Sequence, residues 1–235
     1  MKKLGLFVLL ISLVACTPAD LQSILNAPTS VLSNDEVISG LKEALRIGTE
    51  RSVEKATGSD GFLSNPLIRI PFPQEAIKVK NTLLDIGLNK PVDDFELALN
   101  KAAVEASKEA VPVFVDAITS MSIQDGFNLL KGGENAATNF LREKTTAALT
   151  AKFAPVVHSA TQTVDLTSYW TPLATTYNTT TLLTGGNAID PDLDAYITTK
   201  AIDGLFLLLA DEEKKIREDP LARTTSLLQK VFAQQ

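Results

Sequence analysis

A carboxylate and a guanidinium occur in two apolar stretches of this chain. Asp203 lies in AIDGLFLLLA at positions 201–210, where every other residue is apolar or glycine. A helix that is apolar on all sides is buried, and a buried carboxylate requires a partner. Arg69 has isoleucine on both sides in LIRIPFP. We therefore predict that Asp203 is paired, with Arg69 as the preferred partner and Lys200, one helical turn away, as the alternative. Such a pair would fix a loop against the helix or anchor a ligand.

Two arginines and two threonines surround a proline near the C-terminus. They are Arg217, Arg223, Thr224 and Thr225, around Pro220. A helix that starts after this proline has free backbone N–H groups, which suit an anion. The same residues also fit ordinary capping, with the arginines paired to neighbouring acidic side chains. The sequence therefore offers an anion site and a purely structural interpretation.

The residues that catalysis or metal binding would need are scarce. His158 is the only histidine and lies in FAPVVHSA, where a packed or surface role is favoured. DPDLD at 190–194 begins like a calcium loop, but its sixth and twelfth positions are alanine instead of the required glycine and glutamate. Asp192 as a helix N-cap, with Asp194 favoured by the helix dipole, explains this motif. We predict no catalytic residue, no metal site and no cofactor.

The only cysteine, Cys16, follows a leader of the secretory type. Two lysines precede an apolar run at 4–14, and a small alanine comes directly before the cysteine. The run is shorter than the roughly 20 residues that cross a bilayer. LVAC at 13–16 resembles the bacterial lipobox, which implies removal of residues 1–15 and a diacylglyceryl group on the cysteine sulfur.

The residues after the cysteine suggest where such an anchor would place the protein. Acyl chains would hold the protein at a membrane through Cys16. Thr17 stands where an aspartate would signal retention in the inner membrane. We therefore expect an outer-membrane anchor that faces the periplasm, with residues 16–33 as a tether.

Composition narrows the choice of partner. The chain has 22 basic and 28 acidic residues, which give a net charge of −6. An acidic surface argues against nucleic acid, whose phosphates are bound by lysine and arginine patches. No internal disulfide is available to a chain with one cysteine, so packing must stabilise the fold.

Apolar residues recur mainly at helical spacing. Ser33 and Glu36 fit a capping box at the start of the first helix. Prolines and glycines make residues 58–73 an extended connector. Pro155 is expected to bend or restart a helix, and 178–189 to form a loop. We expect helices at about 33–57, 74–88, 93–110, 112–121, 122–132, 136–152, 192–218 and 221–232. These elements predict an all-α, irregular multi-helix bundle with one helical domain at 34–235.

Five segments resemble a bacterial family known as domain of unknown function 4197. They are GLKEALRIGTERSV (40–53), DGFLSNPLIRIPFP (60–73), AATNFLREKT (136–145), AIDGLF (201–206) and IREDPLARTTSLLQKVF (216–232). The resemblance implies an exported, helical and often lipid-anchored protein. The family has no assigned activity, so it supplies no catalytic residues.

Three functions remain open at this point. The first is a non-enzymatic binding or scaffold lipoprotein of the cell envelope, whose partner is an unknown envelope protein. The second is a carrier of a lipid or other apolar ligand in a cavity between helices. The third and least favoured is a carboxylate-based hydrolase, because the abundant acidic residues do not single out a pair.

Overall fold

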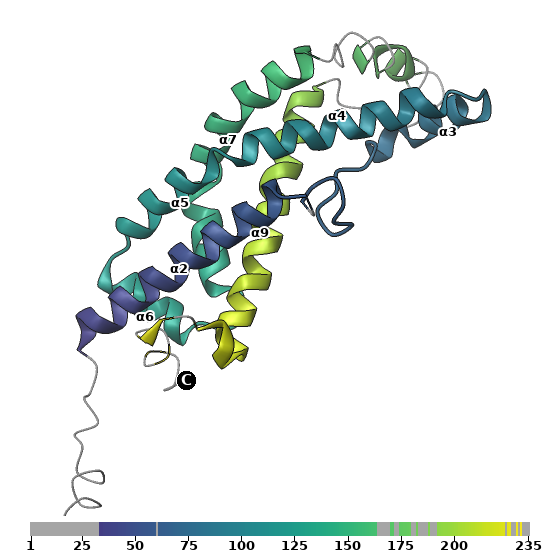
Figure 1. The fold of residues 1–235 in the computed structure, drawn as a ribbon. Coiled ribbons are helices and arrows are strands. Elements are labelled where there is room, and N and C mark those ends of the chain that lie inside the picture. Colours follow the sequence, from purple (N-terminus) through teal and green to yellow (C-terminus); the bar gives the residue numbers. More distant parts are fainter. Residues whose placement is uncertain are drawn as a thin grey trace, which may run out of the picture. The chain divides into compact units, whose positions relative to one another are not determined.

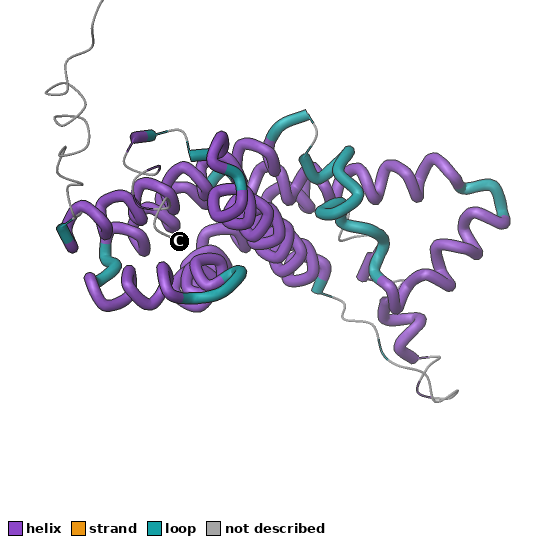
Figure 2. The backbone as a smooth tube through the Cα atoms, turned by 90° about the horizontal axis from the view of Figure 1, so that it is seen from below, coloured by secondary structure: helices purple, strands orange, loops and turns teal. Residues whose placement is uncertain are grey.

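The computed structural model describes residues 33–163 except Asp60, residues 192–223, and single residues or short runs within 170–188 and 225–231. In this part of the chain the fold is all-α, with seven α-helices and no strand, which confirms the predicted class (Figures 1 and 2). The elements are α2 (Asn34–Thr57), η1 (Gln74–Ala76), α3 (Ile77–Asp85), α4 (Asn89–Ser107), α5 (Ala110–Thr119), α6 (Ile123–Lys131), α7 (Ala136–Thr163), α9 (Leu193–Glu218) and η2 (Pro220–Ala222).

Local side-chain caps fix the starts of three helices. The Ser33 hydroxyl accepts from the backbone N–H of Glu36, whose carboxylate accepts from the backbone N–H of Ser33 at 2.8 Å. Ser122 and Asp125 repeat this capping box at α6. Asp192 caps α9 by accepting from the backbone N–H three residues later. All three predicted helix starts are confirmed.

Helix α9 forms the centre of the fold and packs against α2, α4 and α7 (Figure 1). Its apolar face is fully buried, and the ring of Phe206 meets that of Phe114 edge to face at 5.8 Å. Each such side chain contributes roughly 1.5–3 kcal/mol on burial. Residues 33–235 form one compact unit, and the described core residues all lie in it. This unit therefore has its own core and can fold by itself.

The predicted connector 58–73 contains no helix among its described residues, and one buried amide holds its end. Backbone hydrogen bonds fold the described residues of 58–69 into turns, so the prediction that the whole connector is extended is wrong. The Asn100 side chain on α4 accepts from the backbone N–H of Ile70 at 2.8 Å and donates to the Ile70 carbonyl at 2.9 Å. It therefore supplies both partners that a neighbouring strand would offer. Ile68 and Phe72 are buried on the same side as Ile70, which anchors the connector to the core.

A glycine lets the connector approach α9 directly. A Cβ atom at Gly204 would lie 2.8 Å from Phe62 Cε1 and 3.3 Å from Ile68 Cβ. Both connector side chains are buried. A larger residue at position 204 would therefore push the connector away from the helix.

Three details differ from the sequence-based prediction. Helix α7 runs through Pro155 without a restart, because the adjacent Phe153 and Val157 are fully buried and hold it in place. Residues 174–179 and Leu182 are helical, so the predicted loop cannot begin at 178, although most of that segment lies outside the described residues. The predicted helix 221–232 begins later than expected, because Pro220–Ala222 form a 3-10 turn; of the described residues beyond it, Ser226, Gln229 and Val231 are helical. No described helix combines the length and apolar character needed to cross a bilayer.

Candidate functional site

One stripe of α9 remains uncovered by the rest of the fold. Lys200, Asp203 and Leu207 recur every three or four residues along it, and all three are exposed. The expectation that Asp203 is buried is therefore wrong. Leu207 is 46% exposed, and this apolar residue on the solvent side made the sequence look apolar on every side of the helix.

This stripe forms one wall of a groove of about 500 Å³. The connector supplies a second wall with residues 67–71, and the start of α7 supplies a third with Asn139 and Arg142. The connector and α7 both pack on α9, so all three walls belong to the same core. Capping, burial and the Asn100 clamp therefore position the groove without help from a ligand.

The partner of Asp203 is Arg142. Its Nη1 lies 2.8 Å from Asp203 Oδ1, and its guanidinium stacks over the Phe206 ring at 4.4 Å. The predicted pairings of Asp203 with Arg69 or Lys200 are therefore wrong. The spacing of Asn139 and Arg142 indicates that they share a face of α7, but sequence alone cannot show that this face meets α9.

Arg69 is also more exposed than its isoleucine neighbours suggested. Exposed and buried residues alternate from Leu67 to Phe72, so Arg69 faces outward while Ile68 and Ile70 face the core. Its Nη2 lies 3.1 Å from Glu96 Oε2, and the same carboxylate also binds Lys80. The structure nevertheless places Arg69 on the wall of the groove that Asp203 and Lys200 line.

Lys200 has no carboxylate within ion-pair distance among the described residues. Its ammonium lies 5.8 Å from the centre of the Tyr196 ring. The Tyr196 hydroxyl donates to the Pro71 carbonyl at 3.1 Å and so ties α9 to the connector. Of the described residues that line the groove, Arg69, Arg142 and Lys200 are cationic and only Asp203 is acidic. The groove is therefore locally positive in a chain of net charge −6.

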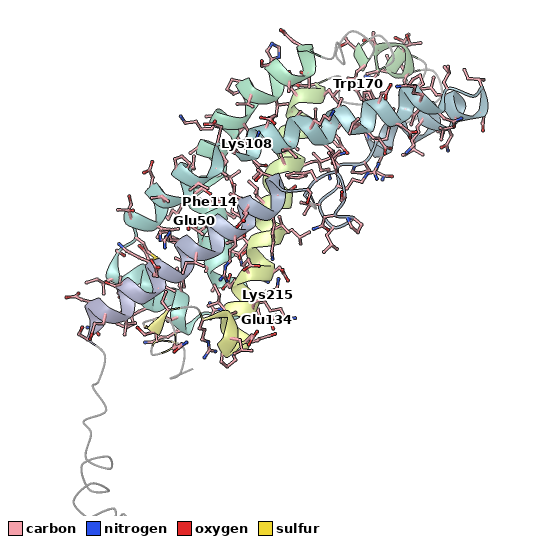
Figure 3. The ribbon with its side chains drawn as sticks, in the orientation of Figure 1. Glu50, Lys108, Phe114, Glu134, Trp170 and Lys215 are labelled. Carbon is pink, nitrogen blue, oxygen red and sulfur yellow. The ribbon has the colours of Figure 1, made fainter. Side chains whose placement is uncertain are left out.

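A second depression of about 1020 Å³ adjoins this groove. The two share Leu67, Asn135, Leu207 and Ala210. Leu67 is 73% exposed, so a strip of apolar surface lies open where the two meet. The rest of the lining of the 1020 Å³ depression includes both acidic and basic residues. One of the acidic residues, Glu134, lies near the C-terminal part of α9 (Figure 3).

The predicted anion site near the C-terminus is occupied by the protein's own groups. The buried Glu213 carboxylate accepts from the backbone N–H of Ala137 at 3.1 Å and of Thr138 at 2.8 Å, at the start of α7. Arg217 donates to this carboxylate and to the Leu129 carbonyl. A helix start does bind an anion here, but the anion is an internal carboxylate.

The other residues of the predicted anion site give it no further support. Arg223 donates to the carbonyls of Ile216 at 3.0 Å and Arg217 at 2.8 Å, and so caps the last turn of α9. Thr225 is engaged in an interaction of its own, and Thr224 lies outside the described residues. The structure therefore favours the purely structural interpretation for both arginines, since each donates to acceptors of the protein itself.

His158 links the two longest helices. Its Nδ1 lies 2.7 Å from Asp194 Oδ2, and the other oxygen of Asp194 accepts from the buried Thr161 hydroxyl at 2.7 Å. Its Nε2, where a catalytic nucleophile would have to lie, contacts Gln162 at 2.7 Å instead. Sequence reasoning missed this role of Asp194, because no local signal connects residues on separate helices. No group of three metal-ligating side chains occurs within the described residues.

Fold and site together define an all-α protein with a charged, partly apolar groove along its central helix. The chain belongs to the family described as "Protein of unknown function (DUF4197)", whose model matches residues 31–233. This confirms the family that the five sequence segments indicated. Comparison with curated proteins and with solved structures gives no match.

Proposed function

We propose that this protein is a non-enzymatic binding lipoprotein of the cell envelope and that its binding site is the groove along α9. The observation that carries the proposal is the exposed apolar strip of Leu67 and Leu207 between charged walls. Apolar surface that stays open within a polar rim is typical of binding sites. The groove walls are fixed by the core, which favours a site that is formed before the ligand arrives.

The anchor part of the proposal rests on the leader and on Cys16. Lipid on this cysteine would hold the mature chain at the outer membrane, facing the periplasm, with residues 16–33 as the tether to the helical body. A tether of this length, if flexible, spans roughly 23 Å.

The two alternative functions have less support from the geometry. A space that lies between α2, α7 and α9 holds only about 30 Å³, which is close to the volume of one water molecule. A carrier would therefore use the open groove instead. For a hydrolase, two carboxylates would have to face one cleft. Asp203 is the only acid among the described residues that line the 500 Å³ groove, whereas Glu54, Glu134, Asp211 and Glu218 line the adjoining depression. A hydrolase would therefore use that depression and not the groove.

Photo-crosslinking in cells tests the groove. A photoreactive residue replaces Leu207 in the groove or, as the control, Leu221, which is 90% exposed and lines neither depression. We expect mass spectrometry to find a crosslinked molecule at 207 and none at 221. Equal labelling at both positions, or none at 207, would contradict the proposal.

Mass spectrometry of the mature N-terminus tests the anchor separately. We expect the chain to begin at Cys16 with acyl groups attached, and a Cys16→Ser variant to leave the membrane fraction. A free thiol on this residue would remove the anchor from the proposal, whatever the groove binds.

A further inference from the structure

We infer that the groove along α9 recognises an anionic amphiphile, with a carboxylate or phosphate head group held by Arg142 and Lys200 and an apolar chain lying on Leu67 and Leu207. This inference rests on the proposed groove function and adds the chemical class of the ligand. It does not depend on the anchor at Cys16.

Two cations in the groove still have unused hydrogen-bonding capacity. Lys200 has only the Tyr196 ring beside it in the described part of the chain. Arg142 gives Nη1 to Asp203, and its Nε and Nη2 form no hydrogen bond with any described residue. A guanidinium that keeps two adjacent donors can bind a carboxylate or phosphate with both.

Arg142 is held in place before a ligand binds. The ring of Phe206 supports its guanidinium at 4.4 Å, and Asp203 fixes one amino group at 2.8 Å. Phe206 is in turn buried against Phe114. Ordering this side chain therefore costs little on binding, and such preorganisation raises affinity.

The charge balance of the groove is positive. Asp203 offsets one of the three cations that line it, and the Glu96 carboxylate is shared between Arg69 and Lys80. A local positive surplus remains on a protein of net charge −6. Complementary charge selects a negative head group over a neutral one and repels cationic ligands.

The apolar strip continues from the cationic wall. Leu67 and Leu207 line both the 500 Å³ groove and the adjoining 1020 Å³ depression. A chain attached to a head group at Arg142 can therefore run over exposed leucine surface into a larger space. Each methylene that it buries raises the affinity by about fourfold.

Titration calorimetry on residues 33–235 tests the inference with four probes, the ionic amphiphiles below their critical micelle concentrations and the alcohol below its solubility limit. Dodecyl phosphate and dodecanoate carry the charge and the chain, dodecanol carries only the chain, and inorganic phosphate carries only the charge. We expect the two anionic amphiphiles to bind at least tenfold more tightly than dodecanol and than phosphate, since hydrogen bonds to a charged group are worth about a factor of ten or more. The stronger of the two anionic probes identifies the head group.

Matched variants locate the binding. Lys200→Gln and Arg142→Gln should each weaken the binding of the stronger anionic probe about tenfold and leave dodecanol unchanged. Lys152→Gln, an equal charge loss at an exposed position of α7, should change neither. Leu207→Ser should weaken all amphiphiles, whereas Leu221→Ser should not. Because Lys200 has no ion-pair partner to lose within the described residues, its variant remains informative if Arg142→Gln disturbs the fold.

Two results would overturn the inference and leave the proposed function intact. One is equal affinity for dodecanol and the anionic probes. The other is no amphiphile binding while position 207 still crosslinks in cells, which would indicate a protein partner in the groove. Loss of both binding and crosslinking would remove the proposed function together with the inference.

Discussion

The C-terminal third and the middle of α9 both carry charged residues, but the fold uses them in opposite ways. Near the C-terminus, Glu212 and Glu213 are buried, and each is surrounded by cations or backbone donors. In the middle, Lys200 and Asp203 stay at the surface beside an exposed leucine. The difference separates charge that builds the fold from charge that remains available for a ligand.

The C-terminal cluster joins α9 to three other helices. Glu213 ties α9 to the start of α7, while Arg217 reaches from the same carboxylate to the Leu129 carbonyl of α6. Glu212 binds Lys55 of α2 and Lys215 of its own helix. Satisfied groups of this kind have no capacity left for a ligand, so this cluster should affect stability and not binding.

The largest effect that sharpens this contrast is expected from Glu213→Ala. The substitution leaves Arg217 and two N–H groups at the start of α7 without their acceptor. Removing one partner of a buried pair costs about 3–5 kcal/mol. Denaturant unfolding followed by the fluorescence of Trp170, the only tryptophan, should show this loss. The exposed Glu218→Ala is the control, and a loss of similar size in both variants would refute the assignment.

A smaller effect is expected at the wall of the groove from Asn100→Ala. It leaves the N–H and carbonyl of Ile70 without side-chain partners. The shorter side chain leaves room for water at both groups, so we expect the low end of the roughly 1–3 kcal/mol range for each, about 2 kcal/mol in total. Hydrogen exchange at the Ile70 amide should become faster. The exposed Asn139→Ala should not change it. Unchanged exchange in the Asn100 variant would mean that the connector is held by apolar packing alone.

Acid should weaken the exposed edge of the C-terminal cluster slightly. The hydrogen bond from Lys215 lowers the pKa of Asp211 below its ordinary value of 3.8. The unfolded chain then binds a proton more readily, so this stabilisation is present above about pH 4 and is lost as the pH falls further. The pair is half exposed, so we expect the effect to stay below about 1 kcal/mol. Between about pH 6 and pH 2.5, Asp211→Asn should lose less unfolding free energy than the wild type, and equal losses would argue against the pair.

The smallest effect on stability is expected from Lys200→Gln in the middle of α9. The side chain is exposed and has no ion-pair partner among the described residues, so the unfolding free energy should change by less than about 0.5 kcal/mol. The same denaturant assay measures it. A large loss would place Lys200 with the structural charges and break the distinction between the two parts of the helix.

Helix boundaries were predictable where the signal is local. Ser33, which pairs with Glu36, and Ser122 each cap a helix through the residue three positions later. Their sequence spacing therefore determines these caps. The clamp of Asn100 on Ile70 joins residues 30 positions apart. No sequence pattern near either residue indicates this contact. The all-α class and the connector were therefore predictable, whereas the contact that holds the connector was not.

The groove residues show the same limit more clearly. Arg69, Lys200 and Asp203 were singled out for the apolar sequence around them, and the structure does bring them to one groove. Their predicted pairings assumed that Arg69 and Asp203 are buried, and both are exposed. Arg69 alternates with buried neighbours, and the exposed Leu207 made the helix around Asp203 look apolar on every side. Arg142 was missed, since only the packing of α7 on α9 shows that it faces Asp203.

The most direct test of the contrast within α9 is an amide NMR titration of residues 33–235 with dodecanoate. The account predicts that the amide signals of 200–207 and 139–142 shift in a saturable manner, while those of the buried Glu212, Glu213 and Ile216, which line neither depression, do not. Shifts confined to these three residues, or no saturable shift in 200–207, would contradict it.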